Sequence, residues 1–269
     1  GGTTVFRFSV ISKNRGAIFA KAISHVGKRV FFYSQDGFFE IDGETIRPIG
    51  QHKVNDYFQS NLSAGYQQNI IASTDPLNHL AIWSYPSTDA TTGVQDRLLI
   101  YNFSVNRWSV VETAAEMIFT QFSEAYTVDT LDNVSSSIDS LSVSLDSRYW
   151  QGGVVNFSGF DGDHKLIQFD GDTLAATIET GEIEPSPGRR STITMVRPLV
   201  DGTSTARVTS RARAADSGTS TSYASLQTNG DIPVRSSGRY HKIGVAIAAA
   251  ASWNDAQGVD LIAISAGNR

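Results

Sequence analysis

The chain has 269 residues, of which 40% are hydrophobic and 18% charged, and its formal net charge at pH 7 is −5. This composition is that of a globular protein, and the longest apolar run, residues 245–251, is too short to span a membrane. The sequence contains no cysteine, which excludes disulfides, thiolate nucleophiles and cysteine-based metal centres.

The first strand signals lie between residues 30 and 49. Three short runs there are rich in aromatic and β-branched residues, which strands prefer. Asp-Gly pairs, which are typical of tight turns, separate them. The period of about ten residues predicts a β-meander. Its expected strands are Val30–Ser34, Phe38–Ile41 and Thr45–Ile49.

The same alternation of strands and turns recurs farther along the chain. Residues 39–46 and 167–174 resemble each other as a diverged strand–turn–strand repeat. The segment Asp129–Asp146 breaks the pattern, since its apolar residues are spaced three and four apart. It is either a short amphipathic helix or a packed loop, because its serines compete with the helical backbone for hydrogen bonds. The further expected strands are Leu80–Tyr85, Leu98–Phe103, Trp108–Val111, Lys165–Phe169 and Thr173–Ile178.

After the break at Pro185–Gly188, five more runs predict a C-terminal antiparallel unit. We therefore divide the chain into a propeller-like β region, residues 1–188, and an antiparallel β unit, residues 189–269. The second unit is either separate or closes the same propeller. Its expected strands are Thr192–Leu199, Ala206–Ala212, Tyr223–Thr228, Tyr240–Ile247 and Val259–Ile264.

The predicted fold class is all-β, with propeller-like blades built from antiparallel meanders. Repetition of the strand–turn–strand pattern favours a propeller over a β-sandwich, which gives similar local signals. The pattern leaves the number of blades open. The chain begins with Gly1-Gly2 and not with Met, which indicates a processed product or a fragment.

Charge is distributed unevenly along the chain. Residues 1–188 hold 22 acidic residues against 12 Lys and Arg, whereas residues 189–269 hold 5 acidic residues against 10 Lys and Arg. Two interpretations stay open. The arginines decorate exposed strand faces, or the protomer is dipolar and its basic end binds an acidic neighbour.

No catalytic centre is predicted. None of the five histidines has a second histidine at metal-ligand spacing, and no phosphate loop, dinucleotide fingerprint or nucleophile elbow occurs. We therefore expect no enzyme activity and assign no catalytic, cofactor-binding or metal-binding residue and no cofactor. The histidines are His25, His52, His79, His164 and His241.

The sharpest metal candidate is the Asp161-Gly162-Asp163 segment. Carboxylates at alternate positions around a glycine are ligands that Ca²⁺ prefers. The pattern lacks the third ligand and the closing Glu of an EF-hand, and Asp-Gly-Asp is also an ordinary hairpin turn. The turn is the favoured interpretation, and a weak Ca²⁺ site at Asp161 and Asp163 stays open.

Two further patterns could serve ligand binding. Trp83, Trp108 and other aromatic residues could stack on sugars, but aromatic residues inside strand runs more often form cores. Arg207, Arg211 and Arg213 cluster in the sequence without partner aromatics, which is a weak signal for nucleic-acid binding.

Several segments spread over most of the chain carry a resemblance when they are taken in order. They are Gly16–Ile23, Gly27, Val30–Gly43, Ile49-Gly50, Val54, Ile100–Ser109, Leu145–Gly153, Phe160–Leu166, Gly238–Tyr240 and Trp253–Asp260. Together they resemble the propeller region of tail nozzle and related tubular tail or head–tail joining proteins of short-tailed bacteriophages. Such proteins are usually considerably longer, which agrees with a fragment or with blades that lie upstream.

This resemblance implies a structural virion protein that assembles into a homo-oligomeric ring, most commonly a hexamer. The ring would sit beneath the portal, contact other tail or head–tail adaptor proteins and line the channel through which the DNA leaves. The implied location is the virion tail, and the host cytoplasm during assembly. An acidic channel wall would let DNA pass without gripping its phosphates, and the acidic balance of residues 1–188 is compatible with that.

Two other function classes are kept beside this one. A receptor- or glycan-binding β module of the tail predicts tryptophans and tyrosines that point outward on one face. A propeller hydrolase predicts two carboxylates that converge in one pocket. Burial of the tryptophans separates the structural protein from the glycan-binding module.

Overall fold

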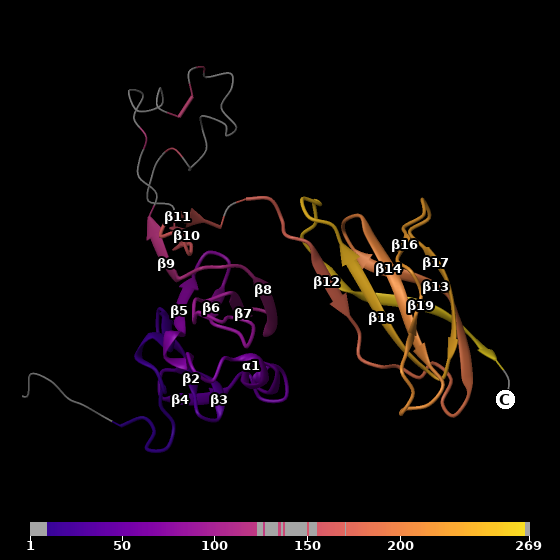
Figure 1. Ribbon diagram of the computed structural model, residues 1–269, viewed down its shortest axis with the longest axis horizontal. Helices are drawn as coiled ribbons and strands as arrows, with labels where there is room; N and C mark the ends of the chain where they lie inside the picture. Colours follow the sequence, from indigo (N-terminus) through magenta and orange to yellow (C-terminus); the bar gives the residue numbers. More distant parts are fainter. Residues whose placement is uncertain are drawn as a thin grey trace, which may run out of the picture. The chain divides into compact units, whose positions relative to one another are not determined.

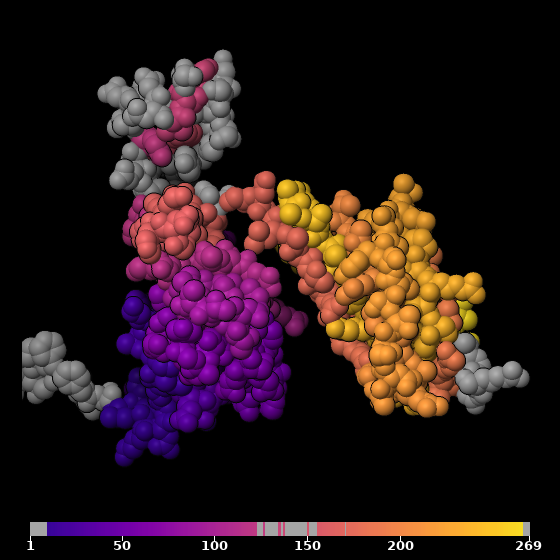
Figure 2. All heavy atoms as spheres, in the orientation of Figure 1, coloured from indigo at the N-terminus to yellow at the C-terminus, as the bar shows by residue number. Residues whose placement is uncertain are grey.

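The computed structural model describes residues 10–122, 126, 134, 135, 137, 150, 155–169 and 171–266. The chain forms two compact units, Gly1–Asp170 and Gly171–Arg269, which are coloured along the chain in Figures 1 and 2. The described part is all-β, and every strand pairing in it is antiparallel. Within these residues, no helix has both the length and the apolar character needed to cross a membrane.

The first unit contains three sheets in its described part, each a meander whose strands follow one another along the chain. Sheet 1 consists of β1 (Ile23–Val26), β2 (Arg29–Ser34), β3 (Gly37–Asp42) and β4 (Thr45–Pro48). Sheet 2 consists of β5 (Ile71–Asp75), β6 (Leu80–Tyr85), β7 (Arg97–Asn102) and β8 (Arg107–Glu112). Sheet 3 consists of β9 (Met117–Phe122), β10 (Val155–Phe160) and β11 (Leu166–Gln168). The helical segments are η1 (Ala20–Ala22), α1 (Asn55–Asn61) and η2 (Gln67–Asn69).

Sheet 2 is buried on both of its faces. Successive side chains of β6 point to opposite faces, and five of its six residues are buried. Trp83 and Tyr85 face an aromatic core shared with sheet 1 and α1, whereas Ile82 faces a second core shared with Ile118 and Phe157 of sheet 3. A strand that is buried on both faces has a nearly continuous apolar sequence, and Leu80–Tyr85 has one polar residue, Ser84.

The core between sheets 1 and 2 is built from aromatic rings, several of which pack edge to face. Phe38 of β3 lies at its centre, with ring centroids 4.8 Å from Phe58 of α1 and 4.8 Å from Trp83. The Trp83 indole N–H donates to the Ala22 carbonyl at 3.2 Å, and the Trp108 indole N–H donates to the Ile49 carbonyl at 3.1 Å. Each buried indole therefore keeps a hydrogen bond while its ring fills the core.

The β2–β3 turn depends on a glycine. Gly37 has φ +114°, and a Cβ at this position would lie 2.0 Å from the Asn55 side-chain nitrogen. The Asn55 amide donates to the Asp36 carbonyl at 3.2 Å and accepts the Phe38 N–H at 3.3 Å. The helix α1 is thereby tied to the turn through one side chain, and only glycine leaves room for it.

A buried carboxylate lies on the core face of sheet 1. The Glu40 side chain is fully buried and pairs with Arg29 and with Arg47, whose Nη2 lies 2.7 Å from Glu40 Oε2. The hydrogen bond to Glu40 is also the main reason that the pKa of Arg47 is raised. Two guanidinium partners compensate the desolvation of this carboxylate.

The second unit is a sandwich of two antiparallel sheets. The first sheet has the order β12 (Ala176–Glu179), β18 (Tyr240–Ile247), β14 (Ser204–Arg211) and β15 (Thr219–Ser220), and β16 (Ala224–Ser225) also pairs with β14. The second has the order β17 (Ile232–Gly238), β13 (Arg190–Val200) and β19 (Ala256–Ala266).

One apolar core lies between these two sheets. In β14 buried residues alternate with partly exposed ones over the whole strand, as expected when one face is covered. The buried aliphatic side chains of this core, from strands of both sheets, are Ile193, Val196, Ala206, Val208, Ile232, Val234, Ile243 and Val245.

Most of the predicted strands of the first unit are present. The expected strand Leu80–Tyr85 coincides with β6, and the expected runs at residues 30–49 and 98–111 correspond to β2, β3, β4, β7 and β8. The predicted all-β class is confirmed, but no closed propeller is identified in the described part of the chain.

Three expectations differ from the structure. Residues 165–178 do not form a strand–turn–strand repeat, because β11 pairs with β10 in the first unit and β12 pairs with β18 in the second. For the same reason, the division falls at Asp170 and Gly171 and not at residues 188 and 189. The expected strand Tyr223–Thr228 shrinks to the two residues of β16, and β17 was not predicted. The segment Asp129–Asp146 lies outside the described residues except for single positions.

Burial of sheet 2 on both faces gives a direct test. Ile82 and Trp83 are neighbours in sequence on opposite faces, so truncating either should open a cavity. We expect Trp83→Ala to cost about 3–5 kcal/mol and Ile82→Ala about 2–5 kcal/mol of unfolding free energy, measured by urea denaturation. The control Val110→Ala, at a partly exposed position of β8, should cost clearly less. If either core variant is as stable as this control, sheet 2 has only one buried face.

Candidate functional site

The Asp161–Asp163 segment forms the turn between β10 and β11. Asp161 Oδ1 accepts the backbone N–H of Asp163 at 3.0 Å and that of Lys165 at 2.9 Å. The Asp163 carboxylate lies 3.5 Å from Lys165 Nζ. Both carboxylates thus have partners within the turn, which supports the favoured interpretation. Within the described residues, no three His, Asp or Glu side chains lie together as a metal would require.

Three of the five histidines occupy turn positions. His52, His79 and His164 have φ angles of 57°, 59° and 63°, in the left-handed region where histidine is enriched among non-glycine residues. The exposed His164 ring lies 2.7 Å from the Glu116 carboxylate, measured from Nδ1 to Oε2. His25 is exposed on β1. Local structure therefore explains where four of the five histidines lie.

The fifth histidine lies between the two sheets of the second unit. His241 of β18 is fully buried, and its ring contacts two serines: Nε2 lies 2.9 Å from Ser191 Oγ, and Nδ1 lies 2.7 Å from Ser210 Oγ. Ser210 Oγ also lies 2.6 Å from Ser236 Oγ. Ser191 and Ser236 belong to one sheet, Ser210 and His241 to the other. The four side chains therefore form a hydrogen-bonded cluster that joins the sheets, which we call the serine–histidine cluster.

Strand alternation places these polar groups inside. Ser210 continues the inward series of Val208 and Ala206 along β14, and His241 continues that of Ile243 along β18. Burial lowers the pKa of His241, because the charged imidazolium would lose its hydration in the core. At neutral pH the ring is uncharged, so one nitrogen donates to a serine and the other accepts.

In the serine–histidine cluster, serine hydroxyls contact an imidazole, as a nucleophile contacts its base in a hydrolase. The surroundings of the cluster, however, differ from those of a catalytic site. No Asp or Glu hydrogen-bonds to the His241 ring among the described residues, and the ring is closed off from solvent. The cluster is therefore a structural tie whose donors and acceptors satisfy one another.

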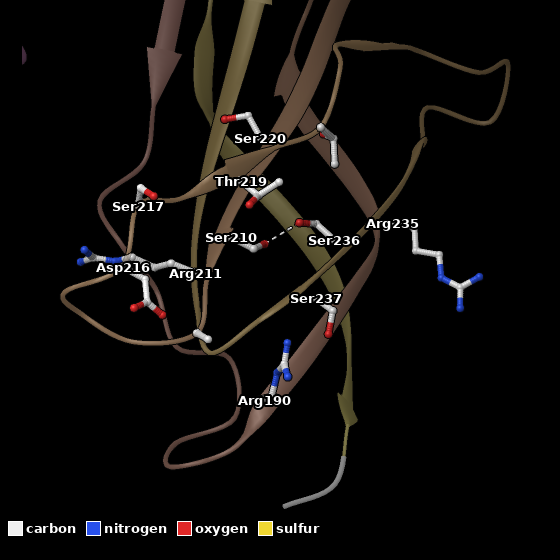
Figure 3. A pocket seen from close by; sticks show the side chains of 12 residues that line it. Arg190, Ser210, Arg211, Asp216, Ser217, Thr219, Ser220, Arg235, Ser236 and Ser237 are labelled. Atoms are coloured by element: carbon white, nitrogen blue, oxygen red, sulfur yellow. Dashed lines mark hydrogen bonds between the residues drawn. The ribbon is translucent and has the colours of Figure 1, made fainter. Parts of the chain in front are cut away.

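A hollow opens beside this cluster, with Ser210 and Ser236 on its wall (Figure 3). It measures about 450 Å³ and is lined by hydroxyl groups, by the carboxylate of Asp216 and by three arginines, Arg190, Arg211 and Arg235. Arg211 pairs with Glu182, whereas Arg190 and Arg235 have no ion-pair partner among the described residues. Arg235 points away from the two serines in Figure 3. The hollow is thus a shallow basic groove that suits an anionic ligand.

Two arginines of the sequence cluster have aromatic partners that the sequence pattern does not predict. The Arg207 guanidinium lies 4.9 Å from the Tyr223 ring centroid, and that of Arg211 lies 5.6 Å from the Tyr240 ring centroid. Arg207 also pairs with Glu179. Antiparallel pairing brings the tyrosines to these positions, since Arg211 lies opposite Tyr240 in the β14–β18 register.

The aromatic residues that could have bound sugars lie mainly in cores. Trp83, Tyr85 and Tyr101 are buried in the core between sheets 1 and 2, and Trp108 packs against it with its ring 4.6 Å from that of Tyr101. Trp150 is buried as well, and Trp253 is half-buried. The outward-facing aromatic cluster expected of a sugar-binding face is therefore not seen among these residues.

Two carboxylates line one other hollow, as a hydrolase would require. Asp231 and Asp260 both border a cavity of about 320 Å³ on the sheet of β13. However, Asp231 Oδ1 accepts the Arg197 Nε–H at 2.8 Å, and its second oxygen accepts an N–H of the Asn229 amide at 2.9 Å. Both oxygens of Asp231 are therefore already engaged by neighbouring side chains.

No protein-family model matches this chain, and no curated protein matches it either.

The low pKa of His241 predicts that the second unit loses stability in acid. As pH falls below about 6.5, the unfolded chain binds a proton that the folded state excludes. Stability is therefore full above that pH and declines below it, by at most about 1.4 kcal/mol per pH unit. Hydrogen-exchange protection factors of β14 and β18 peptides, corrected for intrinsic exchange rates, should fall between pH 7 and pH 5.

The matched variants are His241→Gln and His25→Gln. The first removes the titrating group and should flatten the pH dependence, at a lower stability at pH 7. The second removes an exposed histidine and should leave the slope unchanged. Equal slopes for wild type and His241→Gln would show that His241 does not carry the effect.

Proposed function

We propose that the protein is a structural component of a tailed-bacteriophage tail, a nozzle- or tube-type protein that assembles into a ring around the DNA-exit channel. The observation that carries this proposal is the stacking of successive four-stranded meanders with the middle sheet buried on both faces. The role needs no catalysis and no cofactor. Its expected location is the virion tail, and the host cytoplasm during assembly.

Stacked meanders are the way in which propeller blades pack. Each blade is a four-stranded antiparallel sheet, and consecutive blades cover each other's faces. Sheets 1 and 2 each have four strands in consecutive order, and sheet 2 lies between two cores. This arrangement supports the propeller-like architecture that the repeated pattern predicts, with sheets 1, 2 and 3 as successive blades.

The outer face of sheet 3 supports an assembly role. Directly paired residues share a face, so Met117, Phe160 and Leu166 lie together on the side opposite Ile118. Phe119 joins them, with its ring 5.5 Å from that of Phe160. Met117 is 49% exposed and Leu166 is 52% exposed. An apolar blade face of this kind suits a further blade or a neighbouring protomer.

The charge distribution agrees with a DNA channel. The excess of acidic residues in the first unit, 18 against 12 Lys and Arg in residues 1–170, would make a channel wall that repels phosphates. In the second unit Arg207, Arg211, Arg239 and Lys242 already pair with glutamates of residues 179–184, so few basic side chains are left to contact acidic neighbours.

The purified full chain should form a ring, with six copies as the expected stoichiometry. Light scattering coupled to size exclusion measures its mass, and negative-stain electron microscopy shows its shape, alone and with phage particles. Leu166→Glu should reduce assembly, because it buries a charge in the apolar face of sheet 3. Leu77→Glu, at an exposed turn position, is the matched control. A stable monomer with glycosidase activity would overturn the proposal.

The basic groove of the second unit favours one alternative, a module that binds acidic glycans of a receptor. Arg190 and Arg235 have no ion-pair partner in the described chain and could contact carboxylate or sulfate groups beside hydroxyl donors. On this alternative, Arg190→Ala with Arg235→Ala should weaken binding to sulfated or sialylated glycans by about tenfold or more. Calorimetric titration measures the affinity, and Arg189→Ala, outside the groove, is the control. Equal affinities for wild type and the double variant would exclude the groove as a glycan site.

A further inference from the structure

The strand β19 leaves one long edge of the second unit unpaired. It is 11 residues long and lies at the end of the order β17-β13-β19. It pairs with β13 along almost all its length, from Ala256 to Ala266. On its other side, no strand of the described chain pairs with it. Its outward N–H and C=O groups form a template to which another strand can add.

The other edges of this unit are protected and β19 is not. Soluble proteins keep edge strands short or interrupt them with proline and charged residues. The edge strand β12 has four residues, β15 and β16 have two each, and β17 carries Pro233 and Arg235. In contrast, β19 contains no proline, lysine or arginine, and Asp260 is its one charged residue.

The solvent face of β19 is apolar and hollowed. Ile262 is 53% exposed and Ile264 is 60% exposed, on the face opposite Leu261 and Ala263, which pack toward the sandwich core. Beside Ile262 lies the cavity of about 320 Å³, which Asp260 borders on β19 and which Met195, Arg197 and Asp231 border on the side of β13. A strand added at the free edge of β19 would cover both isoleucines.

We propose that β19 pairs antiparallel with β19 of a second copy of this chain, about a two-fold axis. In a register with Ala263 on the axis, Ile262 of each copy lies opposite Ile264 of the other. Cross-strand apolar pairs of this kind stabilise antiparallel sheets. The same register places each Asp260 opposite Ala266, so no like charges face each other. The two three-stranded sheets join into one of six strands.

The chemistry of the strand selects a second copy as the partner. Self-pairing requires that no charged or bulky side chain meets itself on the axis, and the residue there is alanine. A two-fold contact closes on itself, whereas a ring needs head-to-tail contacts. The β19 contact is therefore separate from the ring contact proposed through sheet 3, and it holds whether or not the protein belongs to a phage tail.

Charge substitution tests the contact. Sedimentation equilibrium of the full chain should show a two-fold association that Ile262→Lys with Ile264→Lys weakens by at least about tenfold. Lysines at an edge are a natural device against strand pairing. Ile178→Lys, at an exposed position of the edge strand β12, should leave the association unchanged. Circular dichroism establishes that each variant is folded. Association that survives the double substitution contradicts the proposal.

Cross-linking tests the register without depending on those variants. The native chain has no cysteine, so a single introduced thiol is the sole site of disulfide formation. Directly opposed strand residues lie within disulfide reach, so Ala263→Cys should give a covalent dimer on mild oxidation. Ile178→Cys should stay monomeric on a denaturing gel.

Leu166→Glu separates this proposal from the proposed function. That variant should lose the ring and still give the Ala263→Cys cross-link, whereas the lysine variants should keep the ring and lose the two-fold contact. Absence of a dimer in sedimentation and of a cross-link would overturn the β19 contact. Capture of β19 by a strand of another tail protein, with no self-association, would equally overturn it.

Discussion

The burial of sheet 2 on both faces is the constraint on which the first unit depends. A sheet with two apolar faces is stable only when something covers each of them, so sheet 2 requires sheet 1 on one side and sheet 3 on the other. The aromatic core that results is large enough to order α1 through Phe58 and to hold two indole rings with their N–H groups bonded. Sheet 3 also exposes apolar side chains on its outer face, so that face needs a covering partner as well.

The second unit covers its apolar sheet faces in another way. Its two sheets cover each other, and their inner faces are aliphatic except at one end, where the serine–histidine cluster replaces apolar contacts with hydrogen bonds. Such bonds have fixed partners, so they align the sheets more specifically than aliphatic packing does. What remains unsatisfied is the outer edge at β19, where backbone groups and two isoleucines face solvent together.

Local sequence patterns predict a strand correctly where a mainly apolar run is bounded by turn residues. Leu80–Tyr85 is apolar except at Ser84 and coincides with β6, and Asp-Gly turns correctly mark the β2–β3 and β3–β4 hairpins of sheet 1. The strand β17 was not predicted, because its polar Ile-Pro-Val-Arg-Ser-Ser-Gly sequence lacks an apolar run and contains proline. The apparent repeat at residues 167–174 has the same turn chemistry as sheet 1 but lies where one unit ends and the next begins. Turn residues predict where the chain bends, but not which strand the following residues pair with.

The sequence by itself determined the all-β class and most strands of the first unit, because these depend on short-range propensity and spacing. Only the tertiary structure decided which strands share a sheet, that His241 meets one serine from each of the two sheets, and that Tyr223 and Tyr240 cover arginines. It also decided that β19 is an edge. These features join residues far apart in the chain, and their contacts follow from strand order and register, which no local pattern encodes.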